Sequence, residues 1–468
     1  MQWDCIVKNG TLVTPAATVK ADLYIKNGKI AAVSDQPLAG GAEREVDAAG
    51  KHVLPGLIDV HVHSRDPGPT YKEDFFTSTA AAAAGGITTI FDMPNTTPPT
   101  RDLASFNRQV ANLTPKAHVD FGLWGICLGP LNNKDLLALS QAGVIGFKYF
   151  WGYAINKKTF QLTYNYRPDM AADVIAPYSD GEVYEIFQHV AQTGRVIAIH
   201  GENSSLIQTL TAQVRKTGRT GYDALLEGRP NLAEAVTVQM GLSFSRASGA
   251  RLHVLHVTTA EAVAAIAHAK AQGAPVSAET CPHYLFLCNE DYPEIGPVMK
   301  IYPPIKYKKD QQQLWRGIKE GTITMISSDH APHTPQEKSG DLWSIPAGMP
   351  GTETMAPLML NAVNEGRITL PKLAALMAEN PARRFGIYPQ KGSLAVGTDA
   401  DLTIVDMNRE KVIRAADLHS KSKVTAYDGW HVKGVPVETM VRGETIMKEG
   451  EIVHAPCGRL VRPQSAGE

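Results

Sequence analysis

The stretch LPGLIDVHVHSRDPG, residues 54–68, holds an apolar run that leads into a histidine pair, His61 and His63. The run predicts a buried strand, and residues two apart on a strand point to the same side, so both imidazoles can bind one cation. An H-x-H pair alone is a weak signal, because many such pairs are solvated or structural. Its interpretation therefore depends on the rest of the chain.

Four further candidate ligands lie at or just after short apolar runs. They are Lys148 in VIGFK, His200 in VIAIH, His256 in RLHVLH and Asp329 in TMISSD. These runs alternate with amphipathic stretches such as LNNKDLLALSQAG and SSLIQTLTAQVRKTG, a pattern that predicts repeated strand–helix units. In an α/β barrel the active site lies where the strands end. The ordered set therefore predicts a metal centre with the ligands His61, His63, Lys148, His200, His256 and Asp329.

The predicted secondary structure divides the chain into segments with different patterns of strands and helices. Residues 1–55 and 387–455 show short strands broken by turns, including two KNG turns that favour hairpins, whereas residues 56–386 alternate strands with helices. This predicts a (β/α)8 TIM barrel over 56–386 and a small β-sandwich domain formed by the N- and C-terminal segments. Residues 456–468 are expected to form a tail, an arm or frayed end that could serve oligomer contacts.

Composition excludes several classes of partner. The net charge is −1, with 43% hydrophobic and 20% charged residues, so no global field recruits nucleic acid or an anionic membrane. No apolar run reaches the roughly 18 residues needed to span a bilayer, and the start, MQWDCIVKNGTLV, lacks the pattern of a secretory signal. The five cysteines form no C-x-x-C pair, which indicates reduced thiols and a cytoplasmic protein. Cys281 could be a metal ligand, but a buried thiol beside the barrel is the preferred interpretation.

Seven segments together resemble one family. They are PGLIDVHVHSRDPG, GGITTIFDMPN, GFKYF, AIHGEN, LHVLHVTT, AETCPHYL and SSDHAPHT. In this order they are similar to the cyclic amidohydrolases of the amidohydrolase superfamily, which contains dihydroorotases, hydantoinases (dihydropyrimidinases) and allantoinases. The resemblance runs from the first ten residues to about residue 455. It implies a hydrolase with the barrel-plus-sandwich fold, commonly a homotetramer or homodimer.

The resemblance also implies a centre of two divalent cations. A lysine ammonium has no lone pair to offer a metal, and in the family this lysine reacts with carbon dioxide to give a bridging carbamate, a role that the GFK motif carries over to Lys148. The alternative is a barrel lysine paired with an acid. The implied ligands are His61, His63, Lys148 and Asp329 for one cation, and Lys148, His200 and His256 for the other. Imidazole and oxygen ligands suit zinc first, with manganese, cobalt and iron as alternatives.

The implied chemistry is metal-assisted amide hydrolysis. A water bridging both metals would have a lowered pKa and supply a hydroxide nucleophile. Asp329 could accept its proton and deliver it to the departing ring nitrogen. Tyr153 lies five residues after Lys148, the spacing at which hydantoinases place a tyrosine that donates to the oxyanion. Its alternative is an aromatic packing against the barrel mouth.

Three residues indicate a site for a substrate carboxylate. Arg65, Asn95 and His333 occupy the motif positions that bind the substrate carboxylate in dihydroorotases. An Arg and an Asn converging near a metal site also suit a carboxylate on chemical grounds. Each has a simpler explanation, because Arg65 could pair with Asp66 or Glu73, and Asn95 could only shape a turn.

Other features favour the hydantoinase and allantoinase branch. They are Tyr153, the WSIPAGMPGTET loop, the segment FGIYPQKGSLAVGTDADL and the overall length. The chain departs from that branch at Tyr302, a further candidate substrate contact where hydantoinases usually have a small residue, and at Ala347, where they often have Asn. We predict hydrolysis of a cyclic ureide or imide to an N-carbamoyl product. The alternatives are a dihydroorotase and, more remotely, a non-catalytic scaffold relative; such relatives have lost metal ligands that this chain retains.

Overall fold

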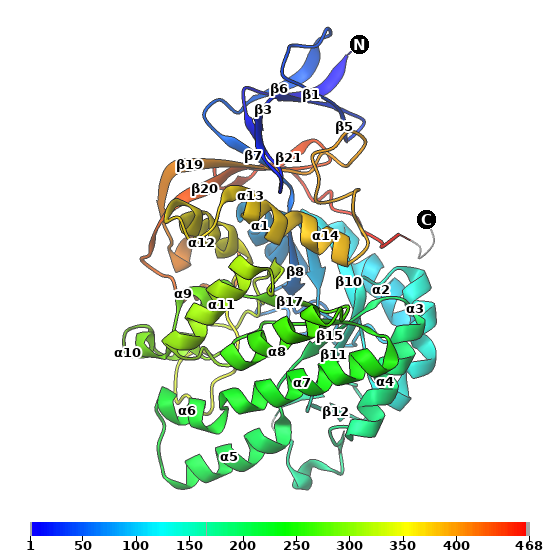
Figure 1. The fold of residues 1–468 in the computed structure, drawn as a ribbon, viewed down its shortest axis with the longest axis vertical. Helices are drawn as coiled ribbons and strands as arrows, with labels where there is room; N and C mark the ends of the chain where they lie inside the picture. Colours follow the sequence, from blue (N-terminus) through cyan, green and yellow to red (C-terminus); the bar gives the residue numbers. More distant parts are fainter. Residues whose placement is uncertain (1, 165, 465–468) are drawn as a thin grey trace.

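The computed structural model describes residues 2–164 and 166–464, and its centre is a parallel barrel (Figure 1). Eight parallel strands are hydrogen-bonded in the order β18-β17-β16-β15-β11-β10-β9-β8. The circle closes where His63 N donates to His330 O over 2.8 Å, beside a parallel bridge between Val62 and His330. The predicted fold class is therefore confirmed. The strands are β8 (Leu57–Val62), β9 (Ile87–Asp92), β10 (Asp120–Ile126), β11 (Gly146–Phe150), β15 (Val196–His200), β16 (Arg251–Val254), β17 (Ser277–Thr280) and β18 (Met325–Ile326).

Helices surround the barrel because each buries one apolar side against the strands. Several begin at side-chain caps, such as Asp74 before α1 and Ser179 before α4, which accept from backbone N–H groups of the first turn. Among the described residues, no helix is long and apolar enough to cross a membrane. The main helices are α1 (Phe75–Ala84), α2 (Leu103–Leu113), α3 (Leu136–Ala142), α4 (Asp180–Gln192), α5 (Ser204–Lys216), α6 (Tyr222–Gly228), α7 (Asn231–Ser248), α8 (Ala260–Ala271), α11 (Lys308–Glu320) and α12 (Thr352–Asn364). Shorter ones are α9 (Pro282–Phe286), α10 (Tyr292–Ile295), α13 (Leu370–Ala374) and α14 (Asn380–Arg384).

Two sheets lie above the barrel, at the top of Figure 1, and one of them combines strands from both ends of the chain. One has the order β22-β21-β20-β19-β7-β2-β3, so strands from the C-terminal segment pair directly with strands from the N-terminal one. The other has the order β5-β4-β1-β6. Their strands are β1 (Trp3–Lys8), β2 (Thr11–Val13), β3 (Thr18–Lys20), β4 (Asp22–Lys26), β5 (Lys29–Ser34), β6 (Ala42–Asp47), β7 (His52–Pro55), β19 (Leu402–Val412), β20 (His431–Val441), β21 (Glu444–Lys448) and β22 (Glu451–Ile452).

The two KNG turns differ in what they connect. The second joins β4 to β5, which pair antiparallel, and Asn27 and Gly28 both have positive φ, as this type of hairpin requires. The first joins β1 to β2, which belong to different sheets, so the hairpin predicted there is wrong. The chain crosses between the sheets at Gly10, where an added Cβ would lie 2.8 Å from Val53 Cγ2. Close packing therefore explains that glycine.

The tail up to Gln464 lies along the barrel and is not a loose arm. The amide of Gly458 donates to Ala117 O over 2.8 Å, and Val461 N donates to Phe121 O over 2.7 Å. Behind this contact the buried Lys391 ammonium binds the carboxylates of Asp120, Asp399 and Asp401. Since Asp120 begins β10 and the other two carboxylates precede β19, this cluster joins the barrel to the β domain.

Candidate metal centre

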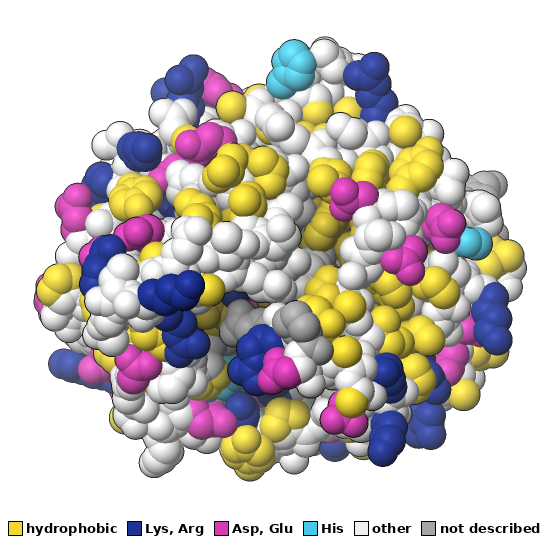
Figure 2. Space-filling view, turned by 90° about the horizontal axis from the view of Figure 1, so that it is seen from below, with side chains coloured by type: hydrophobic (Ala, Val, Ile, Leu, Met, Phe, Trp, Pro, Cys, Tyr) yellow, Lys and Arg dark blue, Asp and Glu magenta, His cyan; other side chains and the backbone are white. Residues whose placement is uncertain are grey.

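All six predicted metal ligands line one cavity at the carboxyl ends of the barrel strands. Figure 2, which views the molecule from the side of α5 and β12, shows a hollow in this face with charged side chains around it. Further polar and aromatic residues, from the same strand ends and from the loops after them, complete the lining of the cavity. The ligands that it brings together are His61, His63, Lys148, His200, His256 and Asp329.

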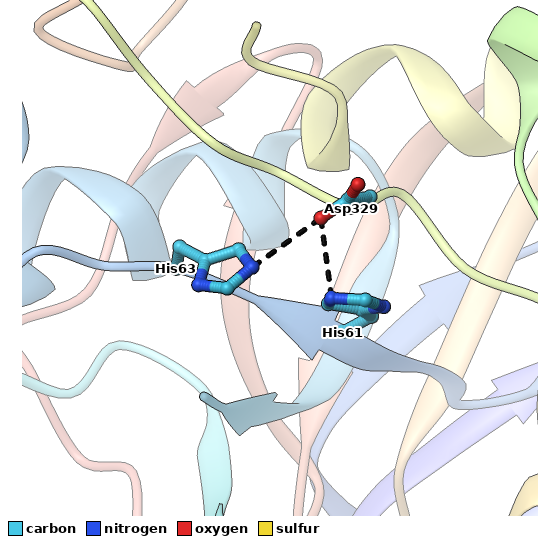
Figure 3. Close-up of side chains that lie close together, drawn as sticks. All are labelled: His61, His63 and Asp329. Carbon is cyan, nitrogen blue, oxygen red and sulfur yellow. Dashed lines mark ion pairs between the residues drawn. The ribbon is translucent and has the colours of Figure 1, made fainter. Parts of the chain in front are cut away.

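The first group of donors consists of His61, His63 and Asp329. Oδ1 of Asp329 lies 3.2 Å from His61 Nε2 and 3.3 Å from His63 Nε2 (Figure 3). One ligand atom from each residue lies within 4.8 Å of the others. Burial raises the pKa of Asp329, but His61, His63 and His256 outweigh it and hold this pKa well below its usual range. An ionised carboxylate and two imidazoles facing one point fit a divalent cation.

The second group consists of His200, His256 and Lys148. His200 Nδ1 lies 3.0 Å from His256 Nε2, so two ring nitrogens face one another inside the cavity. Burial lowers the pKa of both histidines, and at His200 it outweighs the opposing effect of Glu202, which favours the neutral form that binds metals. The side chain of Lys148 is 1% exposed, and burial lowers its pKa to about 7. Its amine is thus readily available in neutral form, and the whole donor set fits two divalent cations.

In three of the candidate histidine ligands, one ring nitrogen is hydrogen-bonded to a neighbouring side chain. His61 Nδ1 lies 2.7 Å from Glu279 Oε1, and His63 Nδ1 lies 2.7 Å from Asn95 Oδ1. His200 Nε2 lies 3.1 Å from Glu202 Oε2. Because these oxygens accept, each ring nitrogen must donate, which leaves the opposite nitrogen free to bind a cation.

Sequence reasoning missed two of these partners, Glu279 and Glu202. Both lie inside segments that carried the resemblance, AETCPHYL and AIHGEN, and that position was the available signal. Glu279 is fully buried, and its second oxygen lies 2.9 Å from His253 Nε2. Burial raises the pKa of Glu279, but His253 and His61 outweigh it and hold the pKa far below its usual range.

The predicted oxyanion donor Tyr153 lines the same cavity. It lies immediately before β12 (Ala154–Asn156), one strand of the small sheet that follows β11. Its hydroxyl lies 3.4 Å from His200 Nε2, and its ring centre lies 4.8 Å from that of Tyr164. The position combines both interpretations from the sequence, since the ring packs at the barrel mouth while the hydroxyl faces the cavity.

Arg65 also lines the cavity, and its buried Nε has no hydrogen-bond partner within the described parts of the chain. The simpler pairings do not occur in the structure. Asp66 binds Lys116 at 2.7 Å, and Glu73 lies 3.4 Å from His330. The guanidinium is therefore available to an anion in the cavity.

The other three candidate substrate contacts differ in position. Asn95 lines the cavity, but its carbonyl oxygen is used by His63. Tyr302 lines it as well, with its ring under the guanidinium of Arg229. His333 lies beside the cavity and not in its lining: Nε2 donates to Ala347 O over 3.0 Å, and Lys72 Nζ lies 3.1 Å from Nδ1. Both nitrogens of His333 are thus already bonded to protein.

The loop that carries Ala347 and Gly348 forms one edge of the cavity. Two buried lysines hold this loop through its backbone. Lys338 Nζ donates to Lys300 O over 2.8 Å and to Pro346 O over 3.1 Å, and Lys300 Nζ donates to Ile345 O over 2.5 Å.

Cys281 does not line the cavity and is completely buried. Its Sγ lies 3.5 Å from Ser327 Oγ, and burial raises the pKa of the thiol well above its usual range. This environment suits an inert thiol and not a metal ligand.

The sequence profile of the amidohydrolase family matches residues 52–446, which include every barrel strand and all six predicted ligands. The chain belongs to this family. An L-hydantoinase from Paenarthrobacter aurescens is 38% identical over 456 residues, 96% of this chain and 96% of that protein. An allantoinase from Rubrobacter xylanophilus is 38% identical over 466 residues, 99% and 98% of the two chains.

A solved structure supports the same relationship. The L-hydantoinase (dihydropyrimidinase) from Arthrobacter aurescens superposes with a TM-score of 0.91 at 37% identity, covering 98% of this chain and 100% of that one. At this level of identity and coverage the resemblance extends to the whole fold, including the β domain. The family predicted from sequence is confirmed.

Proposed function

We propose that this amidohydrolase opens the ring amide of a cyclic ureide or imide and releases an N-carbamoyl product. The chain is a hydrolase of cyclic amides by its family and by its similarity to hydantoinases and allantoinases. One observation carries the proposal: six donors from five barrel strands, β8, β11, β15, β16 and β18, or from the residues just after them, line a single cavity. An open cavity with such donors is the arrangement needed for metal-assisted hydrolysis.

Two divalent cations, zinc in the first instance, would be held by the six donors. When bound, they would polarise the scissile carbonyl and supply a nucleophile of lowered pKa. One set would be His61, His63, Lys148 and Asp329, and the other Lys148, His200 and His256.

Lys148 serves in this proposal as the shared ligand. Its neutral amine attacks carbon dioxide, a C–N bond forms and one proton is released, which leaves a carbamate with two oxygens. The lowered pKa, about 7, favours this reaction because the neutral amine is the nucleophile. A buried lysine with no acid bonded to its Nζ among the described residues supports this role over a simple ion pair.

Asp329 is the proposed proton shuttle. Its Oδ1 faces both imidazoles, whereas the other oxygen points away from them in Figure 3. The second oxygen would receive a proton from the attacking water and deliver it to the ring nitrogen that leaves. Tyr153 would donate its hydroxyl hydrogen to the oxyanion.

Arg65 would bind the polar substituent of the ring. Its unpaired Nε within the cavity supports an acidic or strongly polar group on the substrate. The same observation favours a second candidate function, that of a dihydroorotase, whose substrate carries a carboxylate. The relatives named hydantoinase and allantoinase favour the first candidate.

A parallel hydrolysis assay tests the proposal. Dihydroorotate, allantoin, dihydrouracil and several 5-substituted hydantoins are offered to the enzyme with zinc or manganese and bicarbonate. Turnover of allantoin or a hydantoin supports the first candidate, and turnover of dihydroorotate alone supports the second. A protein without bound metal and without turnover would contradict both. A cytoplasmic location and a homotetramer or homodimer stay predictions from the sequence.

A further inference from the structure

A buried ion pair lies behind the predicted ligand His200. Glu202 Oε2 lies 3.1 Å from His200 Nε2 and accepts from Arg229 Nη1 over 2.7 Å. The side chains of Arg229 and Glu202 are only 8% and 3% exposed. Buried charges are stable only when they are paired, so each member of this pair restricts where the other can lie. Arg229 thereby fixes the carboxylate that orients His200.

A further contact of Arg229 is with the wall of the substrate cavity. Its guanidinium carbon lies 3.5 Å from the centre of the Tyr302 ring, the distance of a stacked cation–π contact. Tyr302 lines the cavity together with His200, and its neighbour Ile301 lines it too. Lys306 Nζ donates to the carbonyl oxygen of Arg229 over 2.5 Å and holds the backbone in place. One side chain therefore contacts both a carboxylate of the predicted metal centre and an aromatic wall.

We propose that Arg229 is a positioning residue that couples Tyr302 to His200, so that a substrate ring resting on Tyr302 stabilises the orientation of a metal-binding histidine. The coupling rests on the proposed function, because it requires that His200 bind a cation. It also gives a reason for Tyr302, which stands where the resemblance implies a small residue. A small side chain there would leave the face of the guanidinium without its aromatic partner.

Arginine is suited to this role and lysine is not. A planar guanidinium can donate along its edge to Glu202 while its face packs on Tyr302, whereas an ammonium is a point charge without a face. The variant Arg229→Lys therefore keeps the buried positive charge but loses the guanidinium that joins Tyr302 to Glu202. Tyr302→Leu removes the same stacking contact by changing its aromatic partner, and it does not alter Glu202 or His200.

The experiment measures how fast zinc leaves the enzyme. Zinc-loaded protein, prepared with bicarbonate, is mixed with a chromogenic chelator, and zinc per chain is determined beforehand. Each single variant should release one of the two zinc equivalents about 10–100-fold faster, the usual effect of losing a residue that orients a ligand. The double variant should be no faster than Arg229→Lys, because the link is already cut. KM for the ring substrate should rise in Tyr302→Leu.

Two controls separate coupling from general damage. Tyr184→Leu removes an aromatic residue that packs on Phe244 and does not line the cavity, and Arg219→Lys changes an exposed arginine that pairs with Asp223 and Glu227. Both should release zinc at the rate of the unaltered enzyme, and thermal melting shows that each variant is folded. If Arg229→Lys does not fold, Tyr302→Leu alone decides the question.

Two results would overturn the coupling. One is Tyr302→Leu with unaltered zinc release, and the other is a double variant in which the two effects simply add. If the unaltered enzyme binds no zinc and hydrolyses no ring, the proposed function itself fails. That failure is seen before any variant is compared.

Discussion

His61, which lines the cavity, has its Nδ1 2.7 Å from Oε1 of Glu279, and both side chains are buried. The second oxygen of Glu279 lies 2.9 Å from His253 Nε2, and His253 Nδ1 lies 2.8 Å from Ser277 Oγ. This chain of contacts holds the His61 ring so that Nε2 faces Asp329. A residue that only orients a ligand should therefore affect metal affinity without touching the metal.

Glu279→Gln tests that relationship. The amide has no charge to hold two donating imidazoles, so zinc affinity should fall about 10–100-fold. Zinc retained after dialysis against graded chelator gives the measurement. The matched control is Glu234→Gln, another buried carboxylate, which accepts from Thr258 N over 2.9 Å. Equal zinc affinity in the two variants would contradict a positioning role for Glu279.

Lys148→Ala should lose both metal and activity, because no other side chain replaces a bridging carbamate. Short carboxylic acids should restore part of the activity by supplying two oxygens at the same place. Lys148→Arg is the control, since it keeps a positive charge but has no amine that reacts with carbon dioxide, and acids should not rescue it. Mass spectrometry of the intact enzyme should show one added carboxyl group that disappears in acid. Full activity of Lys148→Ala would disprove the carbamate.

The proton shuttle is tested by replacing Asp329 in two ways. Asp329→Ala removes both base and ligand, so kcat should fall about 10²–10⁴-fold or more. Asp329→Asn should keep more zinc but stay inactive, because an amide oxygen does not carry the proton. Steady-state kinetics together with metal analysis distinguishes the two effects. An active Asn variant would show that the proton is carried by another group.

Arg65→Ala examines the proposed clamp. Loss of a charged hydrogen bond should weaken binding of an acidic or strongly polar substrate by about 1.5–3 kcal/mol. The change should appear in KM, since the clamp holds the ground and transition states alike. Dihydrouracil, an uncharged ring, should be almost unaffected. Arg101→Ala, which removes a guanidinium packed on Phe160 at 3.9 Å, is the control. No change with any substrate would show that the clamp does not exist.

A histidine outside the cavity lining predicts a pH effect on stability. His419 Nδ1 lies 3.1 Å from Glu353 Oε1, and this hydrogen bond raises the pKa of His419 above its usual 6.5. A raised pKa in the folded state stabilises the protein fully below 6.5, and this stabilisation is lost as pH rises through the folded-state value.

His419→Gln should therefore lower the free energy of unfolding by less than about 1 kcal/mol at about pH 5.5, and by almost nothing at about pH 9. Denaturant unfolding at both pH values measures the difference between the variant and the unaltered enzyme. A larger loss at the higher pH would contradict the linkage.

The six candidate ligands could be predicted to lie together because their positions follow from strand periodicity. His200 ends β15 and Lys148 lies within β11, and strand ends of one parallel barrel meet at the same face. The confirmed fold class rests on the same alternation of strands and helices. These features are local in sequence, so one chain is enough to detect them.

The partners of those ligands could not be predicted, because they depend on contacts between distant residues. Glu279 meets His61 only when β17 and β8 take their places in the closed barrel. Arg229 lies just after α6, in EGRPNL, where no periodic pattern marks it as different from a surface arginine. The hairpin predicted at the first KNG turn is wrong for a related reason, since a local turn signal does not indicate which sheet the next strand joins.

The pairing of β7 with β19 makes the barrel a long insertion between two halves of one sheet. His52 lies opposite Val405, about 350 residues further along the chain. During synthesis at about 5–20 residues per second, β7 would wait roughly 20–70 s for this partner. Throughout that interval β7 has an unpaired edge, which is the kind of surface that pairs with other chains. The growing polypeptide thus carries an unpaired strand edge in its β domain for the whole time in which its barrel is being made.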